Sequence, residues 1–258
     1  MDSETQPVQN ISASTYEYIL NHYLWAILLW SGVTIVLLVL LKAPQVIFFA
    51  LGIAFVGYAY VYSKMKSEFT KQFGASIGFT YSKEAPLDTV SGVMFSMGHG
   101  ASISDVLAGS YQNIPMRIFT YIFTVGSGKN SHTYNYTVFE STFNNELPAI
   151  HLDSSANRFS VPYEFGTGES IKLEGDFNKY FSLHVPKGYE MEAYQIFTPD
   201  VMVQLIDKAK GLDFEFNGNR LYIYSPKIIS KRDKMQAMFD LVDYLVALMS
   251  KNISAVDK

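Results

Sequence analysis

The segment 126–131 (GSGKNS) has the residue types of a phosphate-binding loop, whose backbone amides and lysine hold a phosphate group. Such a loop needs a glycine five residues before its Gly-Lys pair and a serine or threonine after it. Phe123 and Asn130 stand at those two places. The segment also joins two predicted strands, whereas a phosphate loop leads into a helix. The sequence therefore predicts a hairpin turn here.

No other residue pattern indicates a reaction or a metal site. The 5 histidines are scattered without helical spacing or nearby acid pairs, and the chain has no cysteine, so no metal ligand is predicted. A serine hydrolase would show a Gly-x-Ser-x-Gly elbow, and the segment 168–172 (GESIK) fails at its last position. We predict no catalytic, cofactor-binding or metal-binding residue, and an enzyme with a dispersed active site stays open as an alternative.

The segment 84–104 is predicted to be a long loop rich in Gly, Ser and Met. It carries consecutive apolar residues that a solvated loop does not favour, together with one histidine between glycines: Val93, Met94, Phe95 and His99. Long ordered loops are often functional. We therefore name these four residues as a candidate functional loop, and the alternative is that Phe95 and its neighbours fill the domain core.

Composition points to a chain that is partly in lipid. Of the 258 residues, 48% are hydrophobic and only 17% are charged, whereas soluble domains are about 25% charged. The formal net charge is −4. A chain without an excess of bases has no electrostatic footprint for nucleic acid, so nucleic acid is excluded as a partner.

Two apolar runs near the N-terminus, 23–41 and 46–62, predict a transmembrane helical hairpin over 23–62 after a tail at 1–22. At about 1.5 Å per residue the first run spans a hydrocarbon core of about 30 Å. The short link, with Pro44, requires antiparallel helices. The alternatives are a signal peptide, which fits poorly because no base precedes the run, and a buried soluble hairpin.

The positive-inside rule orients this hairpin. The link carries Lys42, whereas Lys64, Lys66 and Lys71 follow the second run. Both termini and the soluble domain are therefore expected on the cytoplasmic side of a two-pass protein whose partner is the lipid bilayer. Small residues such as Gly52 and Gly57 would also let other membrane proteins pack closely.

Beyond the second run, a stalk helix and the entry to the domain are expected over 63–83, with Gly78 just past the helix end. The region 84–258 is expected to be an α+β domain of mainly antiparallel sheet with a few helices. Alternating aromatic and β-branched residues predict its strands, at 106–111, 116–125, 132–143, 149–153, 170–174, 181–185 and 192–197.

The C-terminal part shows the clearest local signals. Thr198 and Pro199 open a helix as N-cap and first-turn residue, and a last helix is expected from Ser230. Between them, Asn217-Gly218 predicts a two-residue hairpin joining strands 213–216 and 220–224.

The segment 172–206 resembles an uncharacterised bacterial membrane-protein family catalogued as a domain of unknown function (number 3137). Leu-Glu, two aromatics four apart, and Thr-Pro opening a helix carry the resemblance, at Leu173, Glu174, Phe177, Phe181, Thr198 and Pro199. The resemblance implies a bacterial inner-membrane protein with an N-terminal hairpin. It implies no catalytic residue, and these six positions have structural roles as caps and core residues.

Three functions follow from these observations. The first is a membrane-anchored interaction or ligand-binding module on the cytoplasmic face with no catalytic site. The second is the enzyme with a dispersed site, and the third is an accessory subunit of a membrane complex. A structure would separate the first two, because an enzyme should show a deep pocket with convergent polar groups and acids of perturbed pKa.

Overall fold

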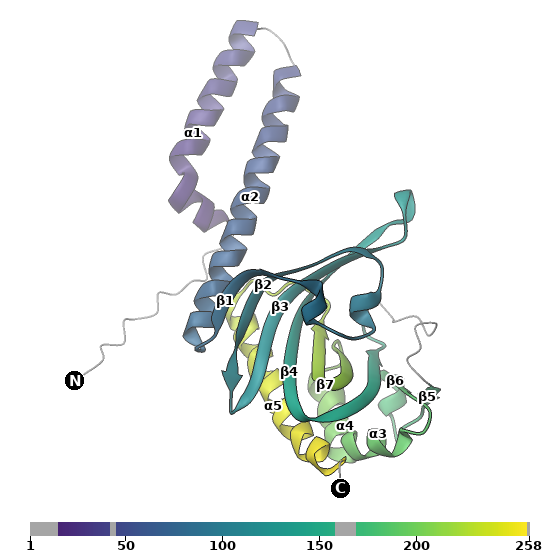
Figure 1. Cartoon of the computed structure of the whole chain (residues 1–258). Helices are drawn as coiled ribbons and strands as arrows, with labels where there is room; N and C mark the ends of the chain where they lie inside the picture. Colours follow the sequence, from purple (N-terminus) through teal and green to yellow (C-terminus); the bar gives the residue numbers. More distant parts are fainter. Residues whose placement is uncertain (1–14, 42–44, 158–168, 257–258) are drawn as a thin grey trace, which may run out of the picture. The chain divides into compact units, whose positions relative to one another are not determined.

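The computed structural model describes residues 15–41, 45–157 and 169–256 (Figure 1). The chain divides into two compact units. The first comprises the residues up to Gln72 together with Ser230–Arg232, and the second comprises Phe73–Ile229 and Asp233–Lys258.

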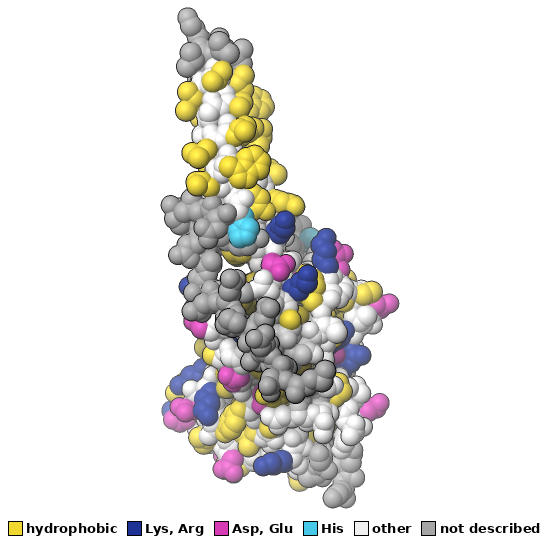
Figure 2. Space-filling model, turned by 90° about the vertical axis from the view of Figure 1, so that its left-hand side faces the viewer, with side chains coloured by type: hydrophobic (Ala, Val, Ile, Leu, Met, Phe, Trp, Pro, Cys, Tyr) yellow, Lys and Arg dark blue, Asp and Glu magenta, His cyan; other side chains and the backbone are white. Residues whose placement is uncertain are grey.

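The first unit is helical, with α1 over Thr15–Leu41 and α2 beginning at Gln45 and ending at Ser76. Both predicted runs are thus helices, although α1 begins inside the expected tail. Large hydrophobic side chains cover the outside of both helices (Figure 2). Within the described residues, Ile47–Ser76 alone is long and apolar enough to cross a membrane, and His22–Leu37 is a shorter apolar stretch. The predicted turn at Pro44 lies outside the described residues.

The end of α2 confirms the role predicted for Gly78. Its φ of +76° lies in the left-handed region, which glycine adopts without strain. The N–H of Phe79 donates to the carbonyl of Gly74 at 2.8 Å, and that of Gly78 donates to Ala75 at 3.3 Å. This pair of bonds is the Schellman motif, which ends a helix and satisfies its last carbonyls. The chain then enters the sheet.

The second unit is an α+β domain built on one sheet in which every strand pairing is antiparallel. The strand order is β1-β2-β3-β4-β6-β5, and β7 also pairs with β4. The strands are β1 (Thr80–Ala85), β2 (His99–Tyr111), β3 (Ile114–Val125), β4 (His132–Ser154), β5 (Glu169–Ile171), β6 (Phe181–Val185) and β7 (Asp213–Ser225).

Strand β4 is the axis of this sheet, with 23 residues. Its first half lies between β3 and β7, and its second half pairs with β6 and β7. Irregular register near Leu147 separates the two halves, and such bulges bend a sheet. Figure 1 shows the resulting curved sheet with α5 across one face.

The predicted Asn217-Gly218 hairpin is wrong. Residues 213–216 and 220–224 belong to the single strand β7, and both pair with β4 rather than with each other. Gly218, with φ of +60°, lies opposite Leu147 at the register shift. The left-handed conformation that would make a tight turn therefore makes a bulge here, because the long β4 offers both segments a partner.

Three helices complete the domain: α3 (Glu190–Ile196), α4 (Pro199–Lys208) and α5 (Arg232–Val256). The strand predicted at 192–197 is wrong, since α3 buries Ala193 and Ile196, three positions apart on one helical face. Thr198 is the N-cap residue of α4 as predicted, although its side chain makes no capping bond. The last helix begins two residues after Ser230.

The predicted loop 84–104 is shorter in the structure. Residues 84–85 end β1, and β2 already begins at His99. Between them the chain forms two 3₁₀ turns, Leu87–Thr89 and Met94–Ser96. We call residues 86–98 the strap.

An aromatic box and an open groove

One face of the sheet carries the aromatic box, a set of rings from β3 and β7: Phe119, Tyr121, Tyr222 and Tyr224. All four are at most 1% exposed. Residues at every second position of a strand share a face, and Tyr121 lies opposite Tyr136 of β4 in the register. The alternation read from the sequence therefore produces a continuous aromatic surface.

Phe95 of the strap fills this box. Its ring centroid lies 4.9 Å from that of Tyr121 and 4.9 Å from that of Tyr222, in edge-to-face geometry. The ring centroids of Tyr224 and Phe119 lie 5.9 and 6.2 Å from that of Phe95. The neighbouring Met94 is fully buried. The strap is thus packed against the sheet, as in the core-filling alternative, and its functional role stays a prediction.

The buried carboxylate of Glu215 binds the backbone of the strap. It accepts hydrogen bonds from the backbone N–H groups of Val93 and Met94, the latter at 3.4 Å, and from the Tyr224 hydroxyl at 2.8 Å. Burial raises the pKa of Glu215, and these donors oppose that shift. The protonation state of this carboxyl therefore affects how firmly residues 93–94 are held.

A second anchor fixes the start of the strap. Arg117 and Arg220 both donate to the carbonyl of Thr89, at 2.9 and 2.6 Å. Arg117 also forms an ion pair with Glu140, which is 3% exposed. The two anchors lie on either side of Ser91, so the backbone of the strap is held at two places, Thr89 and residues 93–94.

The second half of the same face carries a polar row. His151 of β4 lies opposite His184 of β6 and opposite Glu215 of β7 in the register, so these three share a face. His151 is 1% exposed. Burial, with the nearby His184, lowers its pKa to about 3, so the imidazole is neutral at physiological pH.

Asp213 of β7 stands at the end of this row. Burial raises its pKa to about 8, and the nearby Asp153 adds to the shift. The N–H of Ser154 donates to it at 2.8 Å, and the side-chain amide of Asn157 donates to both carboxylate oxygens, at 2.6 and 2.7 Å. Asn157 also lines an open groove, so the polar row reaches that groove.

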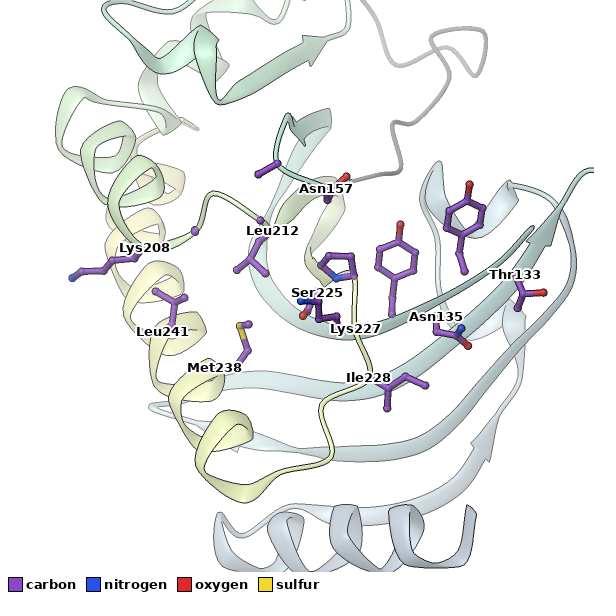
Figure 3. A pocket seen from close by; sticks show the side chains of 16 residues that line it. Thr133, Asn135, Asn157, Lys208, Leu212, Ser225, Lys227, Ile228, Met238 and Leu241 are labelled. Atoms are coloured by element: carbon purple, nitrogen blue, oxygen red, sulfur yellow. The ribbon is translucent and has the colours of Figure 1, made fainter. Parts of the chain in front are cut away.

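The groove has a volume of about 1010 Å³, at the upper end of the range usual for ligand sites. Four separate segments of the domain form it: the start of β4, the residues after its end, the α4–β7 turn, and the chain from Ser225 into α5. Figure 3 shows Met238 and Leu241 of α5 on one side and Asn135 on the opposite side.

The two sides of the groove differ in chemistry. Leu212, Met238 and Leu241 make one side apolar. The groove is also lined by amides and hydroxyls, from Thr133, Asn135, Asn157 and Ser225, and Figure 3 shows Ile228 beside Asn135. A site of this kind can hold a molecule with an apolar part and a hydrogen-bonding part. It presents no nucleophile–base pair among the lining residues.

The described residues include no group of three or more His, Asp or Glu side chains placed to hold a metal ion. His99 is exposed and its Nε2 lies 2.9 Å from the carbonyl oxygen of Gly126. The glycine- and serine-rich segment joins β3 to β4 as the predicted hairpin turn, with a 3₁₀ turn at Gly128–Asn130.

The six residues of the family resemblance lie away from the groove lining. Phe177 and Phe181 are both 1% exposed and stack on each other at 5.0 Å between centroids. Leu173 is buried and Glu174 is exposed, whereas Thr198 and Pro199 open α4. The structure thus places Leu173, Phe177 and Phe181 in the core and Thr198 and Pro199 at the start of α4, whereas Glu174 lies on the surface.

Sequence reasoning missed the groove. Met238 and Leu241 belong to the apolar pattern of the last helix, but the structure leaves both half-buried while Phe239, Val242 and Leu245 fill the core. An apolar stripe wider than the buried face was the one available signal. The other side of the groove comes from segments too far apart to form a local pattern.

The sequence matches no family profile and no curated protein sequence. Among solved structures the domain is similar to the crystal structure of the mycobacterial trehalose monomycolate transport factor A, TtfA. The match has 13% sequence identity and a TM-score of 0.53, and it covers 72% of this chain and 93% of that chain. At this identity the likeness shows a shared fold and nothing more.

Proposed function

We propose that this chain is a membrane-anchored module that binds a ligand through its sheet domain, with no catalytic site. The open groove carries the proposal, because it offers converging polar groups opposite an apolar wall. The alternative of an enzyme with a dispersed active site has no comparable support, since the lining residues pair no nucleophile with a base.

A groove-filling variant tests this function. The full-length protein, purified in mild detergent, is expected to retain a small molecule of discrete mass in native mass spectrometry. Leu241→Trp should abolish that adduct by filling the groove. Val203→Trp is the matched control, because Val203 is 59% exposed on α4 and does not line the groove. Equal adducts in both variants would contradict the proposal.

The anchor is the second part of the proposal. We infer a two-pass hairpin over 23–62 with both termini in the cytoplasm of a bacterium, as the apolar runs, the lysines after the second run and the family resemblance favour. The exposed hydrophobic surface of α1 and α2 supports it, because such side chains are stable in lipid.

The absence of native cysteine allows a direct test of topology. Three variants, each with one cysteine in place of Ser3, Ala43 or Ser82, would be treated with a membrane-impermeant maleimide in intact spheroplasts. A two-pass hairpin predicts labelling at position 43 alone. A single pass through α2 predicts labelling at positions 3 and 43, and a reversed orientation predicts labelling at positions 3 and 82.

An accessory subunit of a membrane complex is the second candidate, and one observation favours it. Between α1 and α2 lies an apolar crevice of about 400 Å³, whose lining includes Trp30 and Gly57. A helix of another protein would fit there because Gly57 has no neighbour within 4 Å of its missing Cβ. TtfA is by its title a transport factor. Gly57→Leu should release such a partner while leaving the groove adduct unchanged.

A further inference from the structure

An apolar strip of three side chains, Leu212, Met238 and Leu241, lines one side of the groove. Met238 and Leu241 are three positions apart on α5 and therefore lie on one helical face. Both are only half-buried, so an alkyl chain laid along them would remove apolar surface from water, which is favourable.

The charged side chains of the groove are all cationic. Lys208 and Lys227 are among its lining residues, and no Asp or Glu is. The Nζ of Lys208 lies 4.3 Å from the Tyr244 ring centroid, and Figure 3 shows this side chain directed outward. The carboxyl of Asp213, which the groove residue Asn157 binds, is 1% exposed. Lys227 is thus the cation best placed to meet a ligand.

We propose that the groove holds a single-chain lipid with an anionic head group, its alkyl chain against Leu212, Met238 and Leu241 and its head at Lys227. This inference rests on the proposed function, because it takes the groove to be the ligand site. The hydroxyl and amide groups of Ser225 and Asn135 supply hydrogen-bond donors for the head group.

Other occupants fit less well. A free phosphate or another small anion would leave the apolar strip exposed to water. A nucleotide would find no loop of backbone amides at a helix start among the lining residues. A peptide remains as an outcome that the test can reveal.

The test uses the full-length protein in nanodiscs of zwitterionic lipid. The probe is a long-chain fatty acid that carries a photoreactive diazirine in its chain, and adducts are mapped by peptide mass spectrometry. We expect adducts within residues 226–241, together with general labelling of the apolar helices. Leu241→Trp and Met238→Trp should remove the groove adducts and keep the helix adducts, whereas Val203→Trp should keep both.

Competitors distinguish the contribution of the alkyl chain of the ligand from that of its head group. Unlabelled fatty acid and a long-chain lysophosphatidic acid should compete, and butyrate should not. Lys227→Glu should weaken both anionic competitors by about fivefold and leave a monoacylglycerol of the same chain unaffected. Lys187→Glu is the control, since Lys187 is exposed and does not line the groove.

Each failure has its own meaning. Equal competition by butyrate overturns the role of the alkyl chain, and equal competition by the monoacylglycerol overturns the anionic head. Groove adducts that persist in both tryptophan variants overturn the site. If the lipid probe fails but native mass spectrometry shows a groove ligand lost in Leu241→Trp, the ligand-binding function stands and the lipid inference is wrong. If a peptide is retained in the groove instead, the ligand-binding function likewise stands and the lipid inference is wrong.

Discussion

The aromatic box and the groove are two hollows on the same sheet, and the described residues fill only one of them. Phe95 occupies the box with its own ring, and Glu215 binds the backbone of the two residues before it, Val93 and Met94. No side chain of the described residues is inserted between the two sides of the groove. A filled hollow stabilises the fold, whereas an open one leaves apolar surface for a ligand. Mutations should therefore affect stability at the box and binding at the groove.

The largest expected loss of stability is at the box. Phe95→Ala removes the ring that contacts four aromatic side chains, and we expect a loss of about 3 kcal/mol in the free energy of unfolding. Chemical denaturation of the detergent-solubilised protein measures it. Leu241→Ala at the groove is the comparison and should cost less than about 1 kcal/mol. Equal losses would remove the distinction between the two hollows.

Glu215→Gln should cause the next largest loss of stability. An amide offers one acceptor oxygen where the carboxylate offers two, so either the bond from Val93 or the bonds from both Met94 and Tyr224 are lost. We expect a loss of about 2 kcal/mol and faster hydrogen exchange at residues 93 and 94. The exposed Glu84→Gln is the control. Unchanged exchange in Glu215→Gln would show that Phe95 packing alone holds the strap.

The pH dependence tests the polar row that joins the two hollows. The pKa of Asp213 is about 8 in the folded protein, above its ordinary value of 3.8. Its contribution to stability is therefore complete below about pH 4 and is lost as pH rises through 8. Relative to the parent, Asp213→Asn should therefore gain roughly 4 kcal/mol in the free energy of unfolding between pH 5 and pH 9, which chemical denaturation at the two pH values measures. The exposed Asp207→Asn should show no such difference.

The smallest effect is expected from Lys227→Gln. Lys227 is exposed at the groove, and substitutions of this kind change stability by less than about 0.5 kcal/mol. Thermal unfolding should therefore match the parent while binding of anionic lipid weakens. A large loss of stability would indicate that Lys227 holds the groove together rather than meeting a ligand.

Local signals predicted the fold where the determining residues are close in sequence. Gly78 ends α2, Thr198 and Pro199 open α4, and the alternation in β3 and β4 pairs those strands. Asn217-Gly218 misled because a bulge and a tight turn need the same left-handed glycine, and β4, distant in sequence, decided between them. The groove was not predicted for the same reason: Leu212, Asn135 and Met238 meet only after the sheet has curved.

The length of β4 has a consequence for synthesis on the ribosome. Thr137 and Leu152 of β4 both pair with β7, whose residues are made at least about 60 positions later, so β4 emerges long before its partner. The apolar helix Ile47–Ser76 leaves the ribosome earlier still. The aromatic face of β4 is therefore not yet paired with β7 at that stage, and it needs protection from aggregation until β7 arrives. A ribosome-bound chain ending before residue 213 should consequently be sensitive to proteases across β4, and one extending past residue 225 by the length of the exit tunnel should not.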